Sequence, residues 1–519
     1  MKFRDHRPPG HTGKGEQHLP RLAGDLKRAL VKAQRSLVHD TLRLPDTGLE
    51  ELARVLVEFA EDIHNDIGIW RSLEQHNSTF LGIPLPFVLE AGEDGGKETT
   101  NRCRVQYLLW ILYSELNPQL IFSPTHQDLR RLAETASRFL EERFADIPKG
   151  SSVKKFLAGP NEFGWEVKTK LVWLGTHSYL FRHRFRNYVE YHGGEASIPV
   201  MDDFVCEETT AWSGLGVVDV LADVIDISED QRSTLRSWSE RHSAYYRVLA
   251  ADGLMLELMN LINEKPYTVR LSGDSGDNAM FEVGKIVIGS LVPWNGEWYW
   301  SGRQHIFGGA TEETLQKLRA DFLREVPRIA YRYCNQLAER ARESANRQYH
   351  EFMEYHNSDL VVYPNGLSMA ADYKRQVLAQ WESKSREEIA KVMEKFELKT
   401  PAPSFSFPDE LLENDNGVGV YCNRDEGLEV MSGFNDIVSG LGKRGVDLTR
   451  DEEEGIRSFI FSSMVSPKFV SRLIQENGSE SIEAAFFIRG RHDEGHIDAL
   501  LRQYKGMYYR NRYPHAALV

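Results

Sequence analysis

Two histidines separated by three residues stand near the end of the chain as candidate metal ligands. His492 and His496 lie in the stretch HDEGHID, with the carboxylates of Asp493 and Glu494 beside them. Residues four apart share a helix face, and a histidine pair at this spacing is typical of zinc hydrolases. The stretch therefore indicates a divalent-metal site and a metal-dependent hydrolase or nuclease. Gly495 weakens a helix here, so a charged loop leading into a helix is the alternative interpretation.

Basic and aromatic residues are interleaved in two other segments, YLFRHRFRNY and YKGMYYRNRYP. This pattern suits single-stranded nucleic acid, because cations follow the phosphates while rings stack on the bases. The competing interpretation is that these cations pair with the abundant carboxylates of the chain. The basic residues concerned are Arg182, Arg184, Arg186, Lys505, Arg510 and Arg512.

An aromatic cluster is the most unusual feature of the sequence. Trp294, Trp298, Tyr299 and Trp300 lie within a few residues of one another in the run WNGEWYW. On a strand, Trp298 and Trp300 point to one face and Tyr299 to the other. One face would fill a core, and the other would present Tyr299 and Arg303 to a ligand or partner. The alternative is that all of these rings serve as core and its cover.

This cluster belongs to a run of short β-branched and aromatic segments over residues 246–308. Five such segments alternate with turn-forming residues, and the Asn295-Gly296 pair between the last two is a strong hairpin signal. The pattern predicts a small five-stranded, barrel-like module.

Helical periodicity covers most of the remaining chain. Its clearest apolar stripe runs through Leu52, Val55, Leu56 and Phe59. The fold class we predict is mainly α and multidomain, α+β overall. We expect a disordered tail over 1–18, helical domains over 19–147, 153–245 and 309–399, the β-rich module over 246–308, a linker over 400–408, and a mostly helical domain over 409–519 with helices near 427–441, 449–463 and 466–476.

Bulk composition limits the classes of protein. With 63 Lys and Arg against 77 Asp and Glu, the net charge of −14 disfavours a dedicated nucleic-acid binder. The cysteines are isolated, which predicts reduced thiols rather than disulfides or a zinc knuckle. No long apolar run or signal peptide is present, so we expect a cytoplasmic protein without membrane contact. The four cysteines are Cys103, Cys206, Cys334 and Cys422.

Several motifs of common enzymes are missing from the sequence. It has no GxxxxGK[ST] phosphate loop, no GxGxxG after a strand and no GxSxG elbow. This disfavours energy-coupled, nicotinamide-dependent and α/β-hydrolase activities, and we lean towards a protein that is not an enzyme and needs no cofactor.

Three stretches resemble a β-module of uncharacterised bacterial proteins: LRSW at 235–238, YRVLAADGLMLELMNLINEKPYTVR, and VGKIVIGSLVPWNGEWYWSG. The helical motifs WSGLGVVDVLAD and LVWLGTHSYLFR resemble the same family. The resemblance implies no activity, ligand or catalytic residue. Proteins of this kind are expected to belong to accessory or defence-type complexes of the bacterial cytosol.

The leading hypothesis is a non-catalytic binding or scaffold protein with a protein partner, in which the aromatic hairpin supplies a contact surface. Two alternatives stay open. One is a metal-dependent hydrolase or nuclease built on residues 492–498, and the other is a nucleic-acid-binding protein that uses the basic segments.

Overall fold

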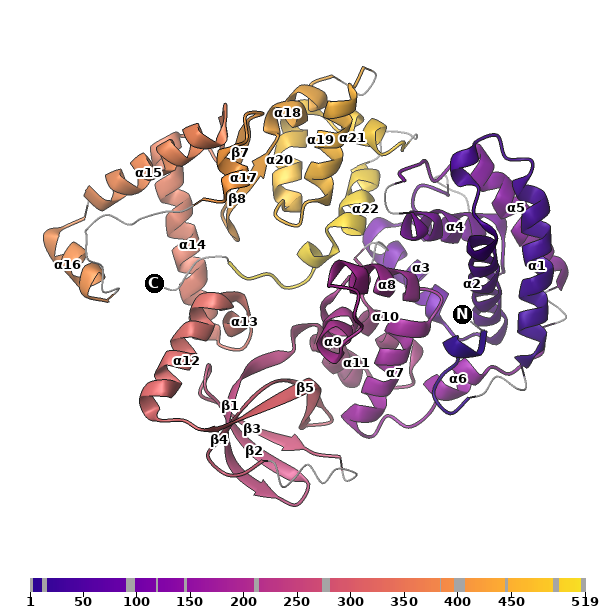
Figure 1. The fold of residues 1–519 in the computed structure, drawn as a ribbon, viewed down its shortest axis with the longest axis horizontal. Helices are drawn as coiled ribbons and strands as arrows, with labels where there is room; N and C mark the ends of the chain where they lie inside the picture. Colours follow the sequence, from indigo (N-terminus) through magenta and orange to yellow (C-terminus); the bar gives the residue numbers. More distant parts are fainter. Residues whose placement is uncertain are drawn as a thin grey trace. The chain divides into compact units, whose positions relative to one another are not determined.

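The chain forms two compact units in a computed structural model (Figure 1). The first unit comprises residues 1–333 and 487–509, and the second comprises residues 334–486 and 510–519. The chain therefore passes from one unit to the other three times. The predicted linker at 400–408 falls inside the second unit, and only its last two residues are described. The structure describes residues 3–11, 16–89, 99–117, 120–143, 147–209, 214–272, 281–382, 384–395, 407–443, 447–488 and 494–514.

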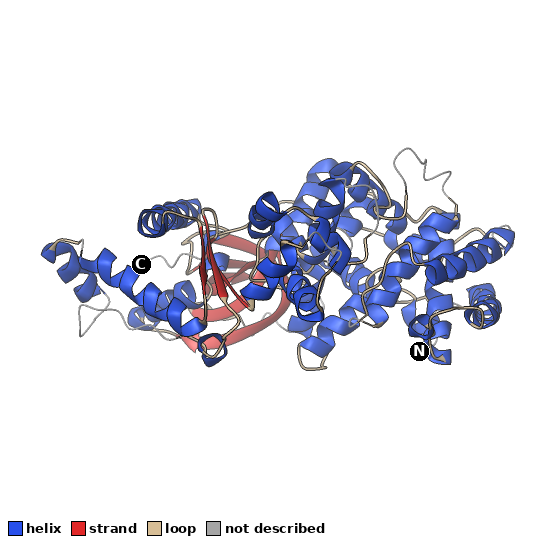
Figure 2. Cartoon of the chain, turned by 90° about the horizontal axis from the view of Figure 1, so that it is seen from above, coloured by secondary structure: helices blue, strands red, loops and turns tan. Residues whose placement is uncertain are grey.

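Helices make up most of the first unit, and Figure 2 shows them in blue. They share one core, to which the apolar stripe of α2 contributes Leu52, Val55, Leu56 and Phe59, all 1% exposed or less. The helical elements before the strands are η1 (Phe3–His6), α1 (His18–Gln34), η3 (Asp40–Leu42), α2 (Asp46–Asn65), α3 (Ile69–Leu81), α4 (Arg102–Leu116), α5 (Gln127–Arg143), α6 (Ser152–Leu157), α7 (Gly164–His177), α8 (Arg182–Tyr191), α9 (Ile198–Glu207), α10 (Val217–Val224), α11 (Glu229–Arg236) and η5 (Ser237–Glu240). Those after the strands are α12 (Glu312–Glu325), α13 (Pro327–Tyr331), α22 (Glu494–Tyr504) and η7 (Gly506–Tyr509).

Five strands follow η5 and close on themselves in the order β1-β2-β3-β5-β4. All neighbours pair antiparallel except β3 and β5, which meet in parallel at Val269 and Trp298. The β4–β5 hairpin turns at Asn295 and Gly296, whose φ angles of 49° and 81° are the left-handed values that a two-residue hairpin requires. The predicted mainly helical fold with a five-stranded central module is thus confirmed. The strands are β1 (His242–Asp252), β2 (Met255–Asn260), β3 (Pro266–Arg270), β4 (Lys285–Trp294) and β5 (Glu297–Gly309).

The second unit holds a three-stranded antiparallel sheet of order β6-β7-β8. The predicted helix over 427–441 is wrong in its first half, because residues 427–432 form β8 by pairing along β7 and the helix begins only at Phe434. The elements are α14 (Asn335–His356), β6 (Leu360–Tyr363), α15 (Gly366–Glu382), α16 (Arg386–Lys395), α17 (Asp409–Leu412), β7 (Val418–Asn423), β8 (Gly427–Ser432), α18 (Phe434–Leu441), α19 (Arg450–Phe461), α20 (Pro467–Asn477) and α21 (Glu480–Ala485).

The segment before α1 differs from the expected disordered tail. In its described part, the side chains of Phe3, His6 and Arg7 are 9% exposed or less. In the described part of the chain, no helix has the length and apolar character of a membrane-spanning segment.

Candidate functional site

Helix α2 carries buried carboxylates beside its apolar stripe. Glu51, Glu58 and Asp62 recur at spacings of seven and four residues, so they lie along one side of the helix. Glu58, Glu61 and Asp62 are 8%, 3% and 2% exposed. Because a buried carboxylate is stable only when it is paired or hydrogen bonded, the partners of this row define the chemistry of the region.

Arg182, the first residue of α8, lies between two of these carboxylates. Its guanidinium is 1% exposed, donates from Nε to Glu51 Oε1 at 2.9 Å, and bonds through Nη1 to Glu58 Oε2. The second oxygen of Glu58, Oε1, is buried and accepts no hydrogen bond. One oxygen of the Glu58 carboxylate is therefore available to accept a hydrogen bond from a ligand.

The segment before α1 supplies a wall of the same region. Arg7 donates to both oxygens of Glu61, at 3.0 and 2.7 Å, and Ser151 Oγ donates to Glu61 at 2.7 Å. The backbone oxygen of His6 accepts a hydrogen bond from Trp173 Nε1 at 3.2 Å. These contacts hold the segment against α2 and α7.

Asp62 has a structural role. Its carboxylate accepts hydrogen bonds from the backbone N–H groups of Gly68, Ile69 and Trp70 at 2.8, 3.2 and 2.7 Å, which caps the start of α3. Tyr179 Oη donates to the same carboxylate at 2.6 Å. With four donors, Asp62 has no acceptor left for a ligand.

A small, half-open cavity lies between these groups, with about 20 Å³ of space open to the centre of a water-sized molecule. Three buried polar atoms of the lining have no hydrogen-bond partner, namely Glu58 Oε1, His6 Nε2 and Arg7 Nε. Arg7 Nε forms an ion pair with Glu16 Oε2 at 3.5 Å, so Glu58 Oε1 and His6 Nε2 are the two that face no charged partner of their own. The lining residues are His6, Arg7, Glu58, Glu61, Asp62, Ile67, Ile69, Val153, Trp173, His177, Ser178 and Tyr179.

Burial affects the protonation of most groups that line the cavity. It lowers the pKa of His6 to about 3, with a further contribution from the charge of Arg182, and it also lowers the pKa of His177. Both rings are therefore neutral at pH 7, and the lining holds one guanidinium beside three carboxyl groups. Burial raises the pKa of Glu58 and of Asp62, because their charged forms are poorly solvated there. A positively charged group would relieve this cost.

The predicted aromatic hairpin packs within the chain. Trp294 is fully buried and donates from Nε1 to the backbone oxygen of Asn161 at 2.9 Å. Tyr299 is 3% exposed and meets the ring of Trp165 on α7 edge-on, at 5.5 Å between centroids. The hairpin face that the sequence predicts to present Tyr299 to a partner thus packs against a helix of the same chain.

The other face of the hairpin points into an aromatic cluster of the barrel. Trp298 lies 4.7 Å from the ring of Tyr267 and 4.6 Å from that of His242. Trp300 lies 5.9 Å from the ring of Tyr246. Of the five predicted binding residues, Arg303 alone is exposed, whereas the four aromatic residues are buried or half-buried.

The two basic segments do not present a common row of free cations. Arg182 is buried between carboxylates, and Arg186 lies 4.0 Å from Glu51. Arg512 donates to both oxygens of Glu426, with the shortest contact at 2.7 Å. Lys505 is 3% exposed. Arg184 and Arg510 are half-buried, and Arg184 acts electrostatically on Glu115.

The predicted metal cluster lies mostly outside the described residues. This applies to His492, Asp493 and the side chain of Glu494. His496 is described: its ring lies 5.4 Å from that of Phe87, and its Nδ1 is buried without a hydrogen-bond partner.

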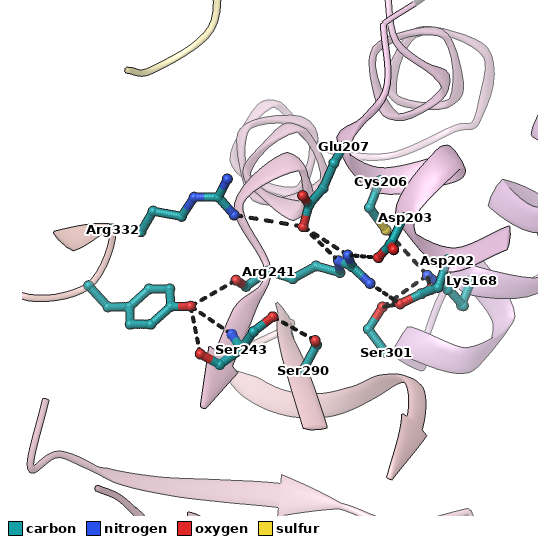
Figure 3. A network of polar contacts seen from close by, with 11 residues as sticks. Lys168, Asp202, Asp203, Cys206, Glu207, Arg241, Ser243, Ser290, Ser301 and Arg332 are labelled. Carbon is teal, nitrogen blue, oxygen red and sulfur yellow. Dashed lines mark hydrogen bonds and ion pairs between the residues drawn. The ribbon is translucent and has the colours of Figure 1, made fainter. Parts of the chain in front are cut away.

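A second polar network joins the helices to the barrel (Figure 3). Arg241, just before β1, bonds to Asp202 and donates to Asp203 and Glu207 at 2.5 and 2.8 Å, all from α9. Beyond Glu207, Arg332 approaches the same carboxylate to 3.7 Å. The network ties α9 to the entry of the barrel.

Lys168 extends this network to the barrel wall. It bonds to Asp202, and its Nζ lies 2.9 Å from Ser301 Oγ on β5 and 3.3 Å from Cys206 Sγ (Figure 3). Burial raises the pKa of the Cys206 thiol, which keeps it protonated and a poor nucleophile at neutral pH. The arrangement is therefore suited to packing rather than to nucleophilic catalysis.

The residues around the cavity, namely His6, Arg7, Glu58 and Glu61, are not among the sites predicted from the sequence. A signal for Glu58 exists in the sequence, because it lies three residues after Val55 and beside Phe59 in the buried stripe. An acid at the edge of an apolar stripe is a candidate for burial. No comparable signal marks Arg7, whose partner lies 54 residues away.

Residues 44–196 match the model of a family described as "Protein of unknown function (DUF3843)". The matched region contains the carboxylates of α2 and Arg182, and it includes the motif LVWLGTHSYLFR. This agrees with the expected resemblance to an uncharacterised family, although it does not extend to the barrel. No curated protein and no solved structure matches the chain.

Proposed function

We propose that the chain is a binding protein that takes a small ligand bearing a primary ammonium group in the cavity beside Glu58. The single observation that carries the proposal is the unpartnered Oε1 of Glu58, which is buried and lines the cavity. A buried polar atom without a partner costs about 1–3 kcal/mol, so a ligand that donates a hydrogen bond there is stabilised. The proposal keeps the expected binding role and moves its site from the hairpin to the helices.

Charge favours a cation over an anion. Three carboxylates and one guanidinium line the cavity, and Arg182 balances part of the charge of Glu58 from behind. The two lining histidines are neutral at pH 7. A primary ammonium group supplies both a positive charge and N–H donors, and it is small enough for a cavity in which polar side chains leave little space.

The test is calorimetric titration of the full-length protein with methylammonium chloride. Tetramethylammonium, which has no N–H donor, and sodium acetate serve as comparison solutes. Methylammonium should bind and the other two should not. Binding should tighten as the pH rises, because protonated Glu58 has no charge to offer and its pKa is raised by burial.

Glu58→Gln is the decisive variant, because it keeps the shape of the side chain and removes the charge. A charge-assisted hydrogen bond contributes about 1.5–3 kcal/mol, so affinity should fall about tenfold to a hundredfold. Glu50→Gln is the matched control on the same helix, since the side chain of Glu50 is 46% exposed. Equal binding by the two variants, or no binding by the unaltered protein, would refute the proposal.

A further inference from the structure

A second group of potential ligands lies between the connection after α1 and the start of α5 and shares no residue with the cavity. His39 lies in the connection between α1 and η3, whereas His126 and Asp128 lie at the start of α5. One ligand atom from each of the three residues falls within 4.8 Å of the other two. Within the described residues, no other three His, Cys, Asp or Glu side chains come together in this way.

We propose that His39, His126 and Asp128 bind a divalent transition metal, with Zn²⁺ as the best fit. Two imidazoles and a carboxylate form a common ligand set for zinc, and three protein ligands leave a fourth position for water or substrate. His39 Nδ1 lies 3.1 Å from Asp128 Oδ2, a separation that adjacent ligands of one ion can have. The rings of His39 and His126 meet edge-on at 4.9 Å between centroids.

The backbone holds the carboxylate in place. Asp128 is 1% exposed and accepts hydrogen bonds from the backbone N–H of Val38, at 3.2 and 3.0 Å, and of His39, at 2.9 Å. These bonds fix the orientation of the carboxylate, as the surroundings of metal-binding carboxylates commonly do. The side chain of His39 is 58% exposed, so a metal ion can reach the group from solvent.

Three contacts compete with the metal. The hydrogen bond between His39 Nδ1 and Asp128 Oδ2 must break before both atoms can bind one ion. The backbone N–H of Asp128 donates to His126 Nδ1 at 3.2 Å, so metal binding must displace this long hydrogen bond or the proton on the other nitrogen. The guanidinium of Arg131 lies 3.5 Å from Asp128 Oδ1 and repels a cation. All three contacts predict modest affinity, and the contact with Arg131 can be removed by mutation.

Zinc titration of the full-length, tag-free protein tests this site, with isothermal calorimetry for affinity and Co²⁺ absorption for coordination geometry. His39→Ala should weaken Zn²⁺ binding by at least about tenfold, because even the loss of an outer partner of a metal ligand costs that much. His305→Ala, which removes an exposed histidine on β5, should leave the affinity unchanged.

Arg131→Gln separates a built site from chance binding by histidines. If Asp128 is a ligand, removing the nearby positive charge should tighten Zn²⁺ binding several-fold, whereas binding at the other histidines would not change. The proposal fails if the unaltered protein binds no Zn²⁺, if His39→Ala binds as tightly as the unaltered protein, or if Arg131→Gln leaves the affinity unchanged.

Discussion

Arg7 illustrates how one buried side chain can hold in place a segment whose composition is typical of disorder. Replacing it by alanine would leave Glu61 buried, with Ser151 as its remaining hydrogen-bond donor at 2.7 Å. Breaking a buried ion pair costs about 3–5 kcal/mol, because the remaining charge stays out of water. We expect Arg7→Ala to lower the stability of the first unit by that amount, measured by urea unfolding followed by tryptophan fluorescence.

Arg4→Ala is the control for this change on the same segment. The side chain of Arg4 is 68% exposed and makes only a surface ion pair with Asp5, so its loss should cost less than about 1 kcal/mol. If both variants unfold at the same urea concentration, the segment does not pack against α2 in the way described.

Arg7 and Glu58 differ in how well the burial of a charged side chain can be predicted from the sequence. The position of Glu58 next to a buried stripe makes its burial predictable from periodicity alone. Arg7 lies among Gly, Pro and charged residues, a composition typical of disorder, and its burial depends on a partner far away in the chain. Local patterns carry no information on such long-range pairs.

Helix α7 packs against the β4–β5 hairpin at Gly164, where there is no space for a side chain. A Cβ on Gly164 would lie 2.6 Å from Cγ of Tyr299. We expect Gly164→Ala to destabilise the protein by about 1–3 kcal/mol, the usual cost of overpacking, although alanine favours helix. Thermal unfolding of Gly164→Ala, Tyr299→Ala and the double variant measures the coupling between the two positions. The cost of the added methyl group should disappear in the Tyr299→Ala background, where Cγ of Tyr299 is absent.

Gly24→Ala should change the free energy of unfolding in the opposite direction, and it serves as the control. Gly24 lies inside α1, and nothing approaches within 4 Å of the position of its Cβ. This substitution should stabilise the protein by about 0.5–1 kcal/mol. Stabilisation by both substitutions would show that the hairpin does not press against α7.

The hairpin itself could be predicted, but its docking could not. Asn295-Gly296 between two alternating runs specifies a turn through backbone geometry alone. Whether Tyr299 faces water or α7 depends on Gly164, which is far away in the sequence. The strand β8 was missed for the same kind of reason, because residues 427–432 become a strand by pairing with β7.

For the whole chain, the returning segment 487–509 is the part whose position is hardest to foresee. It belongs to the first unit although the second unit separates it from residue 333. Arg502 lies 4.4 Å from the ring centroid of Phe80, and Gly506 packs against Gly214 and Thr209. Nothing in composition or periodicity indicates which unit this segment joins.

A synthetic peptide of residues 487–509 should therefore bind the fragment 1–333, as measured by fluorescence anisotropy. Gly506→Ala in the peptide should abolish binding, because the new Cβ would lie 2.4 Å from Thr209 Oγ1 and 2.7 Å from Gly214 Cα. Met507→Ala should bind normally, since Met507 is 45% exposed. Equal binding of all three peptides would argue against the described docking.

The return of residues 487–509 also affects the order of events during synthesis. A ribosome releases the acceptor surface around Phe80, Phe87 and Gly214 well before it has made the segment that covers it. Domains generally fold as units while the chain emerges, and uncovered apolar surface attracts chaperones and other nascent chains. The first unit must therefore wait, incompletely assembled, while residues 334–486 are translated. Slower translation through that interval would prolong the exposure of this surface.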